Sequence, residues 1–316
     1  MPTTIAVVIP CYRVTEHILG VIAEIGPEVS RIYLVDDGCP DESGAFVEQN
    51  SKDKRLRVIF HDENQGVGGA VISGYKAAYA DGADVVVKID GDGQMDPSLI
   101  STISKPVVDG SADYSKGDRF DSLENLFGMP KVRIFGNAIL SLWAKFSTGY
   151  WSITDPTNGF TAIHRRALEA MNLDKIRKSY FFESDILFRL NIANCVVADV
   201  PMVAVYGSEK SNMSIVKVVV EFPWRHTVNL WKRIFYRYYL REWNVGSFEL
   251  PLGLFLVAFG AWFGLSSYIS AAAAGLATTA GQVTGSAVAL ILGVQLLLSF
   301  LSYDVQSEPR IPRQRR

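Results

Sequence analysis

The feature of this sequence that most restricts its fold is a long segment without charge near its C-terminal end. From Leu250 to Tyr303 there is no Asp, Glu, Lys or Arg, although charged residues make up 20% of the chain. Two apolar runs in this segment, Leu250–Ile269 and Ser286–Leu301, approach the ~20 residues that a helix needs to cross a bilayer. We therefore predict a transmembrane hairpin with spans at about 250–270 and 284–303. The alternative is a buried pair of helices in a soluble protein.

Basic residues flank this uncharged segment on both sides. The preceding region alternates aromatic residues with Arg225, Lys232, Arg233, Arg237 and Arg241, and the sequence EPRIPRQRR follows the segment. Basic and aromatic side chains together are typical of a helix at a membrane interface, although a soluble helix that buries its aromatic rings would show the same pattern.

The distribution of basic residues also predicts an orientation and a division of the chain. Because cytoplasmic flanks of membrane spans carry the excess of Lys and Arg, we expect both ends of the hairpin on the cytoplasmic side of an inner or plasma membrane, or of another cytoplasm-facing membrane. The expected regions are amphipathic juxtamembrane helices at 213–246, the hairpin at 247–305 and a basic cytoplasmic tail at 306–316.

The region before residue 213 alternates β-rich runs with segments compatible with helices. The runs are Thr4–Pro10, Arg31–Asp37, Leu56–Phe60 and Asp84–Asp90, and helices are expected at Glu16–Ile25 and Gly68–Ala80. Strands that alternate with helices predict an α/β domain at 1–212 with a mostly parallel sheet, and the apolar strands predict that both of its faces are buried. In such sheets, ligands bind beyond the carboxyl ends of the strands.

The pattern becomes less regular after this point, but further elements can be predicted. We expect a strand and loop at Asp113–Phe120, a helix at Leu126–Phe146, a turn-rich loop at Thr154–Phe160, an amphipathic helix at Phe181–Ala193 and a late pair of strands at Cys195–Tyr206.

Composition excludes several classes of protein. The formal net charge of -2 argues against a nucleic-acid-binding protein, which normally carries a basic domain. The three cysteines, Cys11, Cys39 and Cys195, are widely spaced and odd in number, so they fit neither a disulfide framework nor a metal site. The N-terminal sequence lacks a basic region, and its apolar run is short for a signal peptide. We therefore expect the α/β domain in the cytoplasm.

The strand Asp84–Asp90 leads into a dense group of carboxylates. Asp90 and Asp92, separated by a glycine, repel each other, so the stretch is either an ordinary polar loop or a site for a bound cation. Carboxylate oxygens suit Mg²⁺ or Mn²⁺, whose coordination is usually completed by water and substrate phosphates. Asp96 precedes a proline, which favours the first position of a helix, so we predict that Asp96 caps the next helix.

Two further stretches could contact a nucleotide. Asp36 and Asp37 follow a second strand and could accept hydrogen bonds from a base or ribose. Equally, they could form an acidic turn before a helix capped by Asp41 or Ser43. The glycines in Asn64–Ala78 stand at a helix start, where they permit close approach of the backbone to a phosphate.

Taken together, VVIPCYR, YLVDDGCPDES, NQGVGGAVISGYKAA and IDGDGQMDP resemble glycosyltransferase family 2 in their order and spacing. The resemblance covers about Ile5 to Tyr206, and it implies a GT-A fold and inverting transfer of a sugar from a nucleotide diphosphate. KGDRF, DPTNGF and YGSEKS are similar to the branch that contains dolichol-phosphate mannose synthase and bacterial polyprenyl-phosphate glycosyltransferases. Some bacterial members of this branch also carry interfacial helices and a C-terminal transmembrane hairpin.

The resemblance implies a role for each matching residue. The nucleotide and donor sugar would contact Pro10, Tyr12, Asp36, Asp37, Asn64 and Gly66. The divalent cation and the donor diphosphate would be bound by Asp90, Asp92 and Gln94. Phosphate contacts fall to Arg119 and Lys210, and the acceptor and sugar pocket to Asp155, Thr157 and Gly159. The chain departs from the family at Arg13-Val14, where Asn-Glu is usual, and at Val203 and Ala204, near which an arginine is usual.

The resemblance leaves the acceptor open between two kinds of molecule. A polyprenyl phosphate is the acceptor in this branch, so the expected reaction moves a sugar from a UDP- or GDP-sugar to that lipid. A hydroxyl on a lipid-linked or growing saccharide would instead need a general base, for which Glu183 and Asp185 are candidates unless they cap or salt-bridge their helix. A membrane-tethered nucleotide-binding protein without catalytic activity is a third possibility. Self-association is compatible with each, since interfacial helices and hairpins often pack together.

Overall fold

The chain is represented by a computed structural model that describes residues 3–120, 131–202 and 215–316, without the side chains of 131–135, 137 and 215–220. It divides into two units. The first comprises Met1–Trp231 together with Pro309–Arg316, and the second comprises Lys232–Glu308. The chain therefore leaves the first unit once and returns to it at its C-terminal end.

The first unit is built on a seven-stranded sheet with the order β3-β2-β1-β4-β6-β5-β7. Its strands are β1 (Ile5–Cys11), β2 (Val29–Asp36), β3 (Leu56–Phe60), β4 (Val85–Lys88), β5 (Tyr114–Asp118), β6 (Thr161–His164) and β7 (Val197–Pro201). The pairings of β6 are antiparallel and the other pairings are parallel. The mostly parallel sheet is confirmed. Of the expected late pair of strands at Cys195–Tyr206, one strand, β7, lies in the described residues, and residues 203–206 lie outside them.

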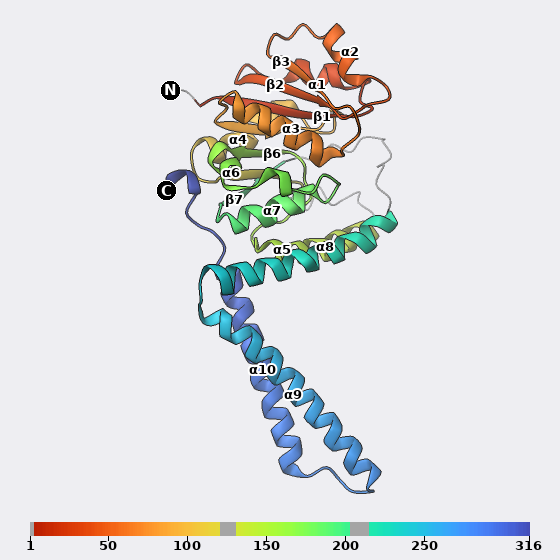
Figure 1. The fold of residues 1–316 in the computed structure, drawn as a ribbon, viewed down its shortest axis with the longest axis vertical. Helices are drawn as coiled ribbons and strands as arrows, with labels where there is room; N and C mark the ends of the chain where they lie inside the picture. The colour runs from red at the N-terminus through yellow and green to blue at the C-terminus, as the bar shows by residue number, and fades with distance from the viewer. Residues whose placement is uncertain (1–2, 121–130, 203–214) are drawn as a thin grey trace. The chain divides into compact units, whose positions relative to one another are not determined.

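Helices cover both faces of this sheet (Figure 1). One face packs against α3 (Val67–Ala80), α6 (Arg165–Ala170) and α7 (Phe182–Ile192). The other packs against α1 (Ile18–Glu24), α2 (Ser43–Asn50) and α4 (Ile100–Val108). Each face has its own apolar core because the strands are apolar at odd and even positions alike, as expected for a sheet buried on both sides.

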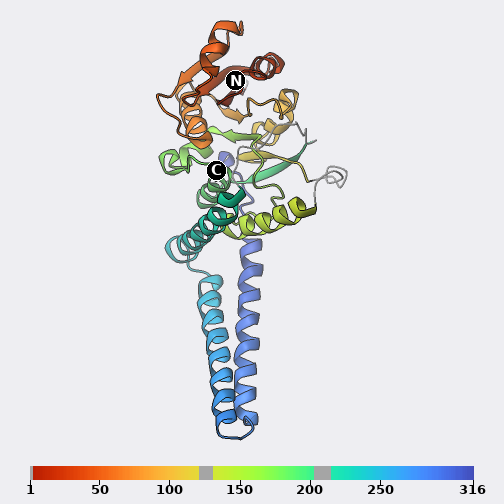
Figure 2. The same ribbon diagram turned by 90° about the vertical axis from the view of Figure 1, so that its right-hand side faces the viewer.

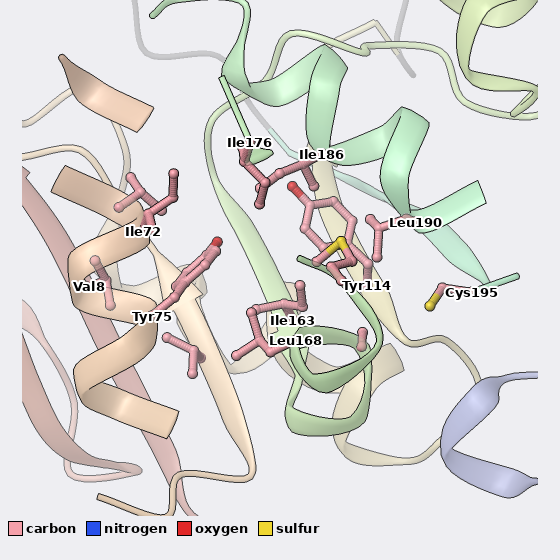
Figure 3. Packing of buried hydrophobic residues seen from close by; sticks show 14 of the residues in the cluster. Val8, Ile72, Tyr75, Tyr114, Ile163, Leu168, Ile176, Ile186, Leu190 and Cys195 are labelled. Atoms are coloured by element: carbon pink, nitrogen blue, oxygen red, sulfur yellow. The ribbon is translucent and has the colours of Figure 1, made fainter. Parts of the chain in front are cut away.

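The core beneath α3 and α7 shows how closely the helices approach the strands. In Figure 3, Tyr75 of α3 lies on one side of Ile163, while Tyr114 of β5 and Leu190 of α7 lie on the other. Gly74 lets α3 lie directly on β1, because a Cβ at this position would collide with the side chain of Val8.

Two longer helices complete the first unit. They are α5 (Lys131–Thr148) and α8 (Ile215–Phe235), the last residues of which belong to the second unit. His226 and Asn229 on α8 are buried, whereas Trp224 and Trp231 are exposed. A helix is present in this region as expected, and it packs one side into the domain while large rings on another side are uncovered. Its location at a membrane interface stays a prediction.

The second unit is a helical hairpin preceded by a single π-helical turn, Tyr236–Arg241. Its helices, α9 (Val245–Ala273) and α10 (Ala280–Gln306), are long and apolar enough to cross a membrane by length and composition, with mean hydropathies of 1.7 and 2.0. They lie side by side in Figures 1 and 2. Gly260 brings them close, and its carbonyl accepts a hydrogen bond from Ser286 Oγ at 2.8 Å.

A buried ion pair joins the two ends of the second unit. Arg233 donates to both oxygens of Asp304 at 2.7 and 2.9 Å, and the hydroxyl of Tyr238 donates to the same carboxylate at 2.6 Å. All three side chains are buried. The end of α10 is therefore fixed to the helical segment that precedes α9.

The basic segment after the hairpin, expected as a separate tail, is packed against the first unit. The backbone amides of Arg313 and Gln314 donate to the carboxylate of Asp113 at 2.7 and 2.9 Å. The Gln314 side chain donates to the carbonyls of Val107 and Ala112. This contact forms because Asp113 is buried and needs donors, and the residues that supply them lie about 200 positions away in the chain.

Candidate active site

Two groups of carboxylates lie at the same edge of the sheet. β2 and β4 flank β1 and run parallel to it, so the residues that follow them emerge together. Asp36 ends β2 and Asp37 follows it, whereas Asp90 and Asp92 follow β4. Because adjacent strands are ~4.8 Å apart, the two strand ends on either side of β1 are separated by roughly 10 Å. Both groups therefore lie beyond the carboxyl ends of parallel strands, where ligands bind in sheets of this kind.

The carboxylate of Asp90 is paired with a cation from its own strand. Lys88, the last residue of β4, places Nζ 2.7 Å from Asp90 Oδ1 and 3.9 Å from Glu183 Oε1. The side chain of Lys88 is 2% exposed and that of Asp90 is 29% exposed. Burial opposes the charge on Lys88, but the carboxylates of Asp90 and Glu183 raise the pKa of Lys88 overall. A buried ammonium thus offsets part of the negative charge at this strand end.

Local hydrogen bonds shape the loop that follows β4. The backbone amide of Gln94 donates to Asp92 Oδ1 at 3.0 Å, and both residues are partly exposed. Asp96 accepts a hydrogen bond from the amide of Ser98 at 2.8 Å at the start of the 3₁₀-helix Pro97–Leu99. The prediction that Asp96 is a helix cap is confirmed.

The strand register aligns four polar residues in one row across the sheet. Lys88 of β4 pairs with Thr161 of β6, Thr161 pairs with Lys116 of β5, and Lys116 pairs with Asp199 of β7. The row two residues earlier is apolar and consists of Val86, Ile163, Tyr114 and Val197. Because paired residues share a face, this face of the sheet changes from apolar to charged within two residues.

Two members of this row have fewer hydrogen bonds than their burial requires. Lys116 is buried, and within the described part of the chain its Nζ has no hydrogen-bond partner. Burial lowers the pKa of Lys116 despite the nearby carboxylates of Asp155 and Asp199. Burial also raises the pKa of Asp199 to about 6. Its Oδ2 accepts a hydrogen bond from the amide of Thr154 at 2.6 Å.

Arg119 and Asp155 form an ion pair with two contacts. Arg119 Nε donates to Asp155 Oδ2 at 2.6 Å, and Nη2 donates to Oδ1 at 3.1 Å. Burial acts to raise the pKa of Asp155, but the bonds from Arg119 and the charge of Lys116 lower it overall. Thr157 Oγ1 lies 3.4 Å from Asp155 Oδ1. The structure therefore brings together Arg119, Asp155 and Thr157, with Arg119 partly exposed to solvent.

Gly159, from the same loop as Asp155, lies next to the acidic strand end. A Cβ at this position would collide with Lys88 Nζ and would lie 3.1 Å from Asp90 Oδ2. Its expected place was the acceptor and sugar pocket. In the structure, it permits the loop to pass directly over the pair formed by Lys88 and Asp90.

The two acidic residues in the first turn of α7 have different surroundings. The buried carboxylate of Asp185 has three donors: the amide of Arg177 at 3.0 Å, Arg189 Nε at 2.9 Å and Asn229 Nδ2 at 3.2 Å. Glu183 instead lies beside Lys88, and burial raises the pKa of Glu183 against the opposing charge of that lysine. Asp185, one of the two candidate catalytic bases, is thus held within the fold and forms a salt bridge with Arg189 of its own helix.

Asp36 binds the chain that follows it. Its carboxylate accepts hydrogen bonds from the amides of Cys39 at 2.7 Å and Gly44 at 2.6 Å. Gly44 lies in the first turn of α2, where amides lack partners within the helix. The expected cap from Asp41 or Ser43 is therefore wrong, because the end of β2 already places the Asp36 carboxylate at these amides.

Asp37 holds the loop that precedes α3. It accepts hydrogen bonds from the amides of Gln65 at 2.9 Å and Gly66 at 2.7 Å, and Asn64 Oδ1 also accepts from Gly66. Gly66 has a φ of 87°, and a side chain there would meet the carbonyl of Lys178. The glycine thus permits a close approach to backbone. The nucleotide contacts expected of Asp37, Asn64 and Gly66 stay predictions.

The remaining expected site residues are less constrained. Pro10 lies in β1 opposite Val35, at the same edge of the sheet. Tyr12 is exposed, and the guanidinium carbon of Arg13 lies 5.5 Å from the centre of its ring. Lys210 lies outside the described residues.

Comparison with known proteins agrees with this geometry. Residues 6–171, more than half of the chain, match Glycosyl transferase family 2. The chain belongs to this family. The acidic strand end, Lys88, Lys116 and the pair formed by Arg119 and Asp155 all lie within the matched residues.

Several curated family relatives are named for transfer to a lipid phosphate. A UDP-N-acetylglucosamine--dolichyl-phosphate N-acetylglucosaminyltransferase from Methanococcus voltae is 28% identical over 64% of this chain and 86% of its own length. An undecaprenyl-phosphate mannosyltransferase from Micrococcus luteus is 30% identical over 66% of this chain and 88% of its own length. A polyprenol monophosphomannose synthase from Mycolicibacterium smegmatis is 29% identical over 62% of this chain and 75% of its own length.

Solved structures confirm the expected GT-A fold of this glycosyltransferase. Glucosyl-3-phosphoglycerate synthase from Mycobacterium tuberculosis, in complex with Mn²⁺, UDP and phosphoglyceric acid, has a TM-score of 0.55 at 18% identity. The match covers 73% of this chain and 78% of the synthase. The same synthase with Mg²⁺ and UDP has a TM-score of 0.53. At this identity, the likeness concerns the fold alone.

The carboxylate oxygens of this glycosyltransferase fit a divalent cation whose remaining coordination positions are filled by a substrate. No group of three or more His, Cys, Asp or Glu side chains suited to a metal ion occurs among the residues that the structure describes. Asp90 and Asp92 supply oxygen ligands from two side chains. Mg²⁺ and Mn²⁺ commonly bind through one or two carboxylates and complete their coordination with phosphates and water. The residues present fit this arrangement.

Sequence reasoning missed the charged row that crosses the sheet. Lys88, Lys116 and Asp199 were not among the expected site residues, although each lies in a predicted strand. A signal was present in VVVKID, where a lysine ends an apolar run in a sheet that buries both faces. A lysine in such a position needs a carboxylate partner, and Asp90 two residues later provides one.

Proposed function

We propose that this glycosyltransferase moves one sugar, with inversion, from a UDP- or GDP-sugar to a polyprenyl phosphate at the cytoplasmic face of a membrane. The proposal assigns the donor diphosphate to the edge near Asp90 and Asp92. It assigns a phosphate contact to Arg119. The names of the relatives support a lipid phosphate as the acceptor, and the two apolar helices support a location at the membrane.

The observation that carries the choice of acceptor is the environment of Asp185, one of the two candidate bases. Asp185 is buried and accepts three hydrogen bonds. Both oxygens of this carboxylate are engaged by donors of the fold, so Asp185 is poorly placed to contact the hydroxyl of an acceptor. A polyprenyl phosphate needs no such base, because its phosphate is already an anion when it reaches the site.

The bond changes follow from this choice. A phosphate oxygen of the acceptor attacks the anomeric carbon of the donor, and the bond from that carbon to the diphosphate breaks. The electron pair leaves with the nucleotide diphosphate, and no proton needs to be removed. The protein's contribution is to align the two substrates and to stabilise the leaving charge.

Each group of residues has a task in this step. A divalent cation bound by Asp90 and Asp92 would neutralise charge that develops on the leaving diphosphate. Arg119, fixed by Asp155 and partly exposed, would hold a phosphate of the donor or the acceptor. The partner carboxylate sets the orientation of the guanidinium, which favours binding of phosphate in a defined geometry.

The hairpin would anchor the enzyme where its acceptor resides. The two helices pass the length and composition required for membrane spans, and basic residues flank them on both sides. We propose that both flanks, and with them the catalytic unit, lie in the cytoplasm. The exposed rings of α8 would contact the interface of the same membrane.

A specific observation favours one rival. Burial raises the pKa of Glu183, and a carboxylate with a raised pKa is suited to accept a proton from a hydroxyl. In that case the acceptor would be a hydroxyl of a lipid-linked or growing saccharide. Glu183→Gln would then abolish transfer, whereas transfer to a phosphate would keep a measurable rate in this variant.

A donor screen with membranes that contain the protein tests the proposal. UDP- and GDP-sugars with a radioactive label would be supplied with undecaprenyl or dolichyl phosphate, and the lipid fraction would be counted. A labelled lipid that mild acid cleaves is the expected product. Absence of product unless a saccharide acceptor is added would support the rival. Thermal stabilisation by nucleotide without turnover of any donor would indicate a binding protein.

A further inference from the structure

Lys88 links two carboxylates that belong to different elements. Its Nζ lies 2.7 Å from Asp90, which follows β4, and 3.9 Å from Glu183 in the first turn of α7. The lysine is buried, and Glu183 exposes only 16% of its side chain. A buried ammonium between two carboxylates is confined in position, because moving away from them would leave its own charge unpaired in the interior.

The surrounding residues also restrict Asp90. Its backbone amide donates to Met95 Sδ at 3.4 Å, and a Cβ at residue 159 would lie 3.3 Å from the terminal methyl of Met95 and 3.1 Å from Asp90 Oδ2. The same Cβ would collide with Lys88 Nζ. Gly159 thus lies against one side of the ion pair formed by Lys88 and Asp90. Because Gly159 has no side chain, the ion pair fits beside it.

We infer that Lys88 is a positioning residue for cation binding: anchored by Glu183, it holds Oδ1 of Asp90 and so orients the carboxylate for the divalent cation. Through this contact, α7 and the acidic strand end act as one unit. The inference rests on the proposed function for the assignment of Asp90 as a cation ligand. Residues that orient a metal-binding carboxylate typically change metal affinity ~10- to 100-fold when they are removed.

The sign of the effect separates positioning from simple repulsion. If Lys88 acted only through its positive charge, its removal would strengthen the binding of another cation nearby. If Lys88 orients Asp90, its removal weakens that binding. The double variant Lys88→Met with Glu183→Gln removes one positive and one negative charge, so the net charge is unchanged. Any change in cation binding then reports mainly the loss of orientation of Asp90.

The experiment measures binding of Mn²⁺ to the purified full-length protein by calorimetry, in the presence of UDP and, separately, GDP. We expect about 10- to 100-fold weaker Mn²⁺ binding in the double variant than in the unmodified protein. The matched control replaces the surface pair formed by Lys76 and Asp174 with Met and Asn, and Mn²⁺ binding should not change. Unchanged or stronger Mn²⁺ binding in the Lys88 double variant would overturn the inference. So would absence of Mn²⁺ binding by the unmodified protein.

A second variant keeps the test decisive if the double variant does not fold. Gly159→Ala retains Lys88, Glu183 and Asp90 but fills the space beside the ion pair. The φ of Gly159 lies outside the left-handed region, so alanine introduces no backbone strain. We expect weaker Mn²⁺ binding in a protein that still unfolds cooperatively, although at a somewhat lower temperature, and unchanged Mn²⁺ binding would contradict the inference. Transfer of sugar to polyprenyl phosphate is measured separately, so failure of this inference would leave the proposed function standing.

Discussion

The carboxylates at the edge of the sheet differ in the partners that the chain gives them. Asp36 and Asp37 accept hydrogen bonds from the backbone amides of the loops that follow. Asp90 contacts a buried lysine and keeps part of its side chain exposed. The first two therefore stabilise the loops of the site, and the acidic pair after β4 is better placed to bind a ligand that arrives from solvent.

The first prediction concerns Asp92. We expect Asp92→Ala to lower the rate of transfer roughly 100-fold or more, because the cation it would bind supplies several kcal/mol of stabilisation to the leaving diphosphate. The residue is partly exposed, so the variant should melt within a few degrees of the unmodified protein. Transfer and thermal unfolding would be measured on the same preparation with Mn²⁺ present. Full activity in the variant would remove Asp92 from the metal site.

Sequence reasoning at this scale found the acidic residues and missed their cationic partners. Aspartates that follow a predicted strand stand out in the sequence because they interrupt an apolar run. Lys116 and Asp199 face each other only through the pairing of β5 with β7, and their positions in the sequence are far apart. Such a row cannot be predicted before the order of the strands is known.

At the scale of elements, the antiparallel strand β6 determines which residues meet. It lies between β4 and β5 and pairs with both. The alternation of strands and helices predicted the parallel part of the sheet correctly. It could not predict this insertion, because the pairing of β6 depends on contacts between distant segments and not on local periodicity.

The second prediction concerns the packing of α8 against α5. His226 on α8 is buried, its Nδ1 lies 2.7 Å from Ser147 Oγ, and its ring contacts Phe181. Burial lowers the pKa of His226 to about 4 from its ordinary value of 6.5. Below pH 6.5, the unfolded state therefore binds a proton that the folded state excludes, and the free energy of unfolding falls as the pH drops towards 4. We expect this loss to reach roughly 2–3 kcal/mol.

A matched variant isolates the contribution of this histidine. His226→Gln retains a hydrogen-bonding side chain but does not titrate in this range. Thermal unfolding of both proteins would be compared between pH 7 and pH 5. As the pH falls from 7 to 5, the unmodified protein should lose more stability than the His226→Gln variant. An equal loss in both proteins would show that His226 is not the group responsible.

The third prediction concerns the buried ion pair of the second unit. Asp304→Ala leaves Arg233 without its charged partner in a buried position, which typically destabilises a protein by ~3–5 kcal/mol. Replacing both residues by Met and Leu removes the two charges together and should restore most of the stability. Thermal unfolding of the full chain in detergent would rank the three proteins. If Asp304→Ala were as stable as the unmodified protein, the ion pair between Arg233 and Asp304 would not stabilise the second unit.

At the scale of the whole molecule, the hairpin is an insertion between two parts of the first unit. The chain leaves this unit after Trp231 and returns at Pro309. The uncharged segment predicted the hairpin, since its length and composition are local properties. The return of the basic segment to Asp113 was not predictable, because exposed basic residues at a chain end carry no sign of a backbone contact.

The fourth prediction tests this return. Deleting residues 309–316 removes the donors that Arg313 and Gln314 supply to Asp113, and we expect a loss of about 2–4 kcal/mol in stability, since several hydrogen bonds disappear. The hairpin is intact in this variant, so the protein should stay in the membrane fraction. Arg310→Ala, at an exposed position of the same segment, is the control and should melt normally. An unchanged melting temperature after the deletion would argue against a stabilising contact.

The most direct test of the proposed function compares two acceptors that differ only in the phosphate. Purified protein with Mn²⁺ and the labelled donor identified by screening would be given either a polyprenyl phosphate or the corresponding polyprenol. We predict label in the phosphate lipid, none in the alcohol, and loss of the product with Asp92→Ala. Label in the alcohol, or transfer only to a saccharide acceptor, would contradict the proposal that the acceptor is a lipid phosphate.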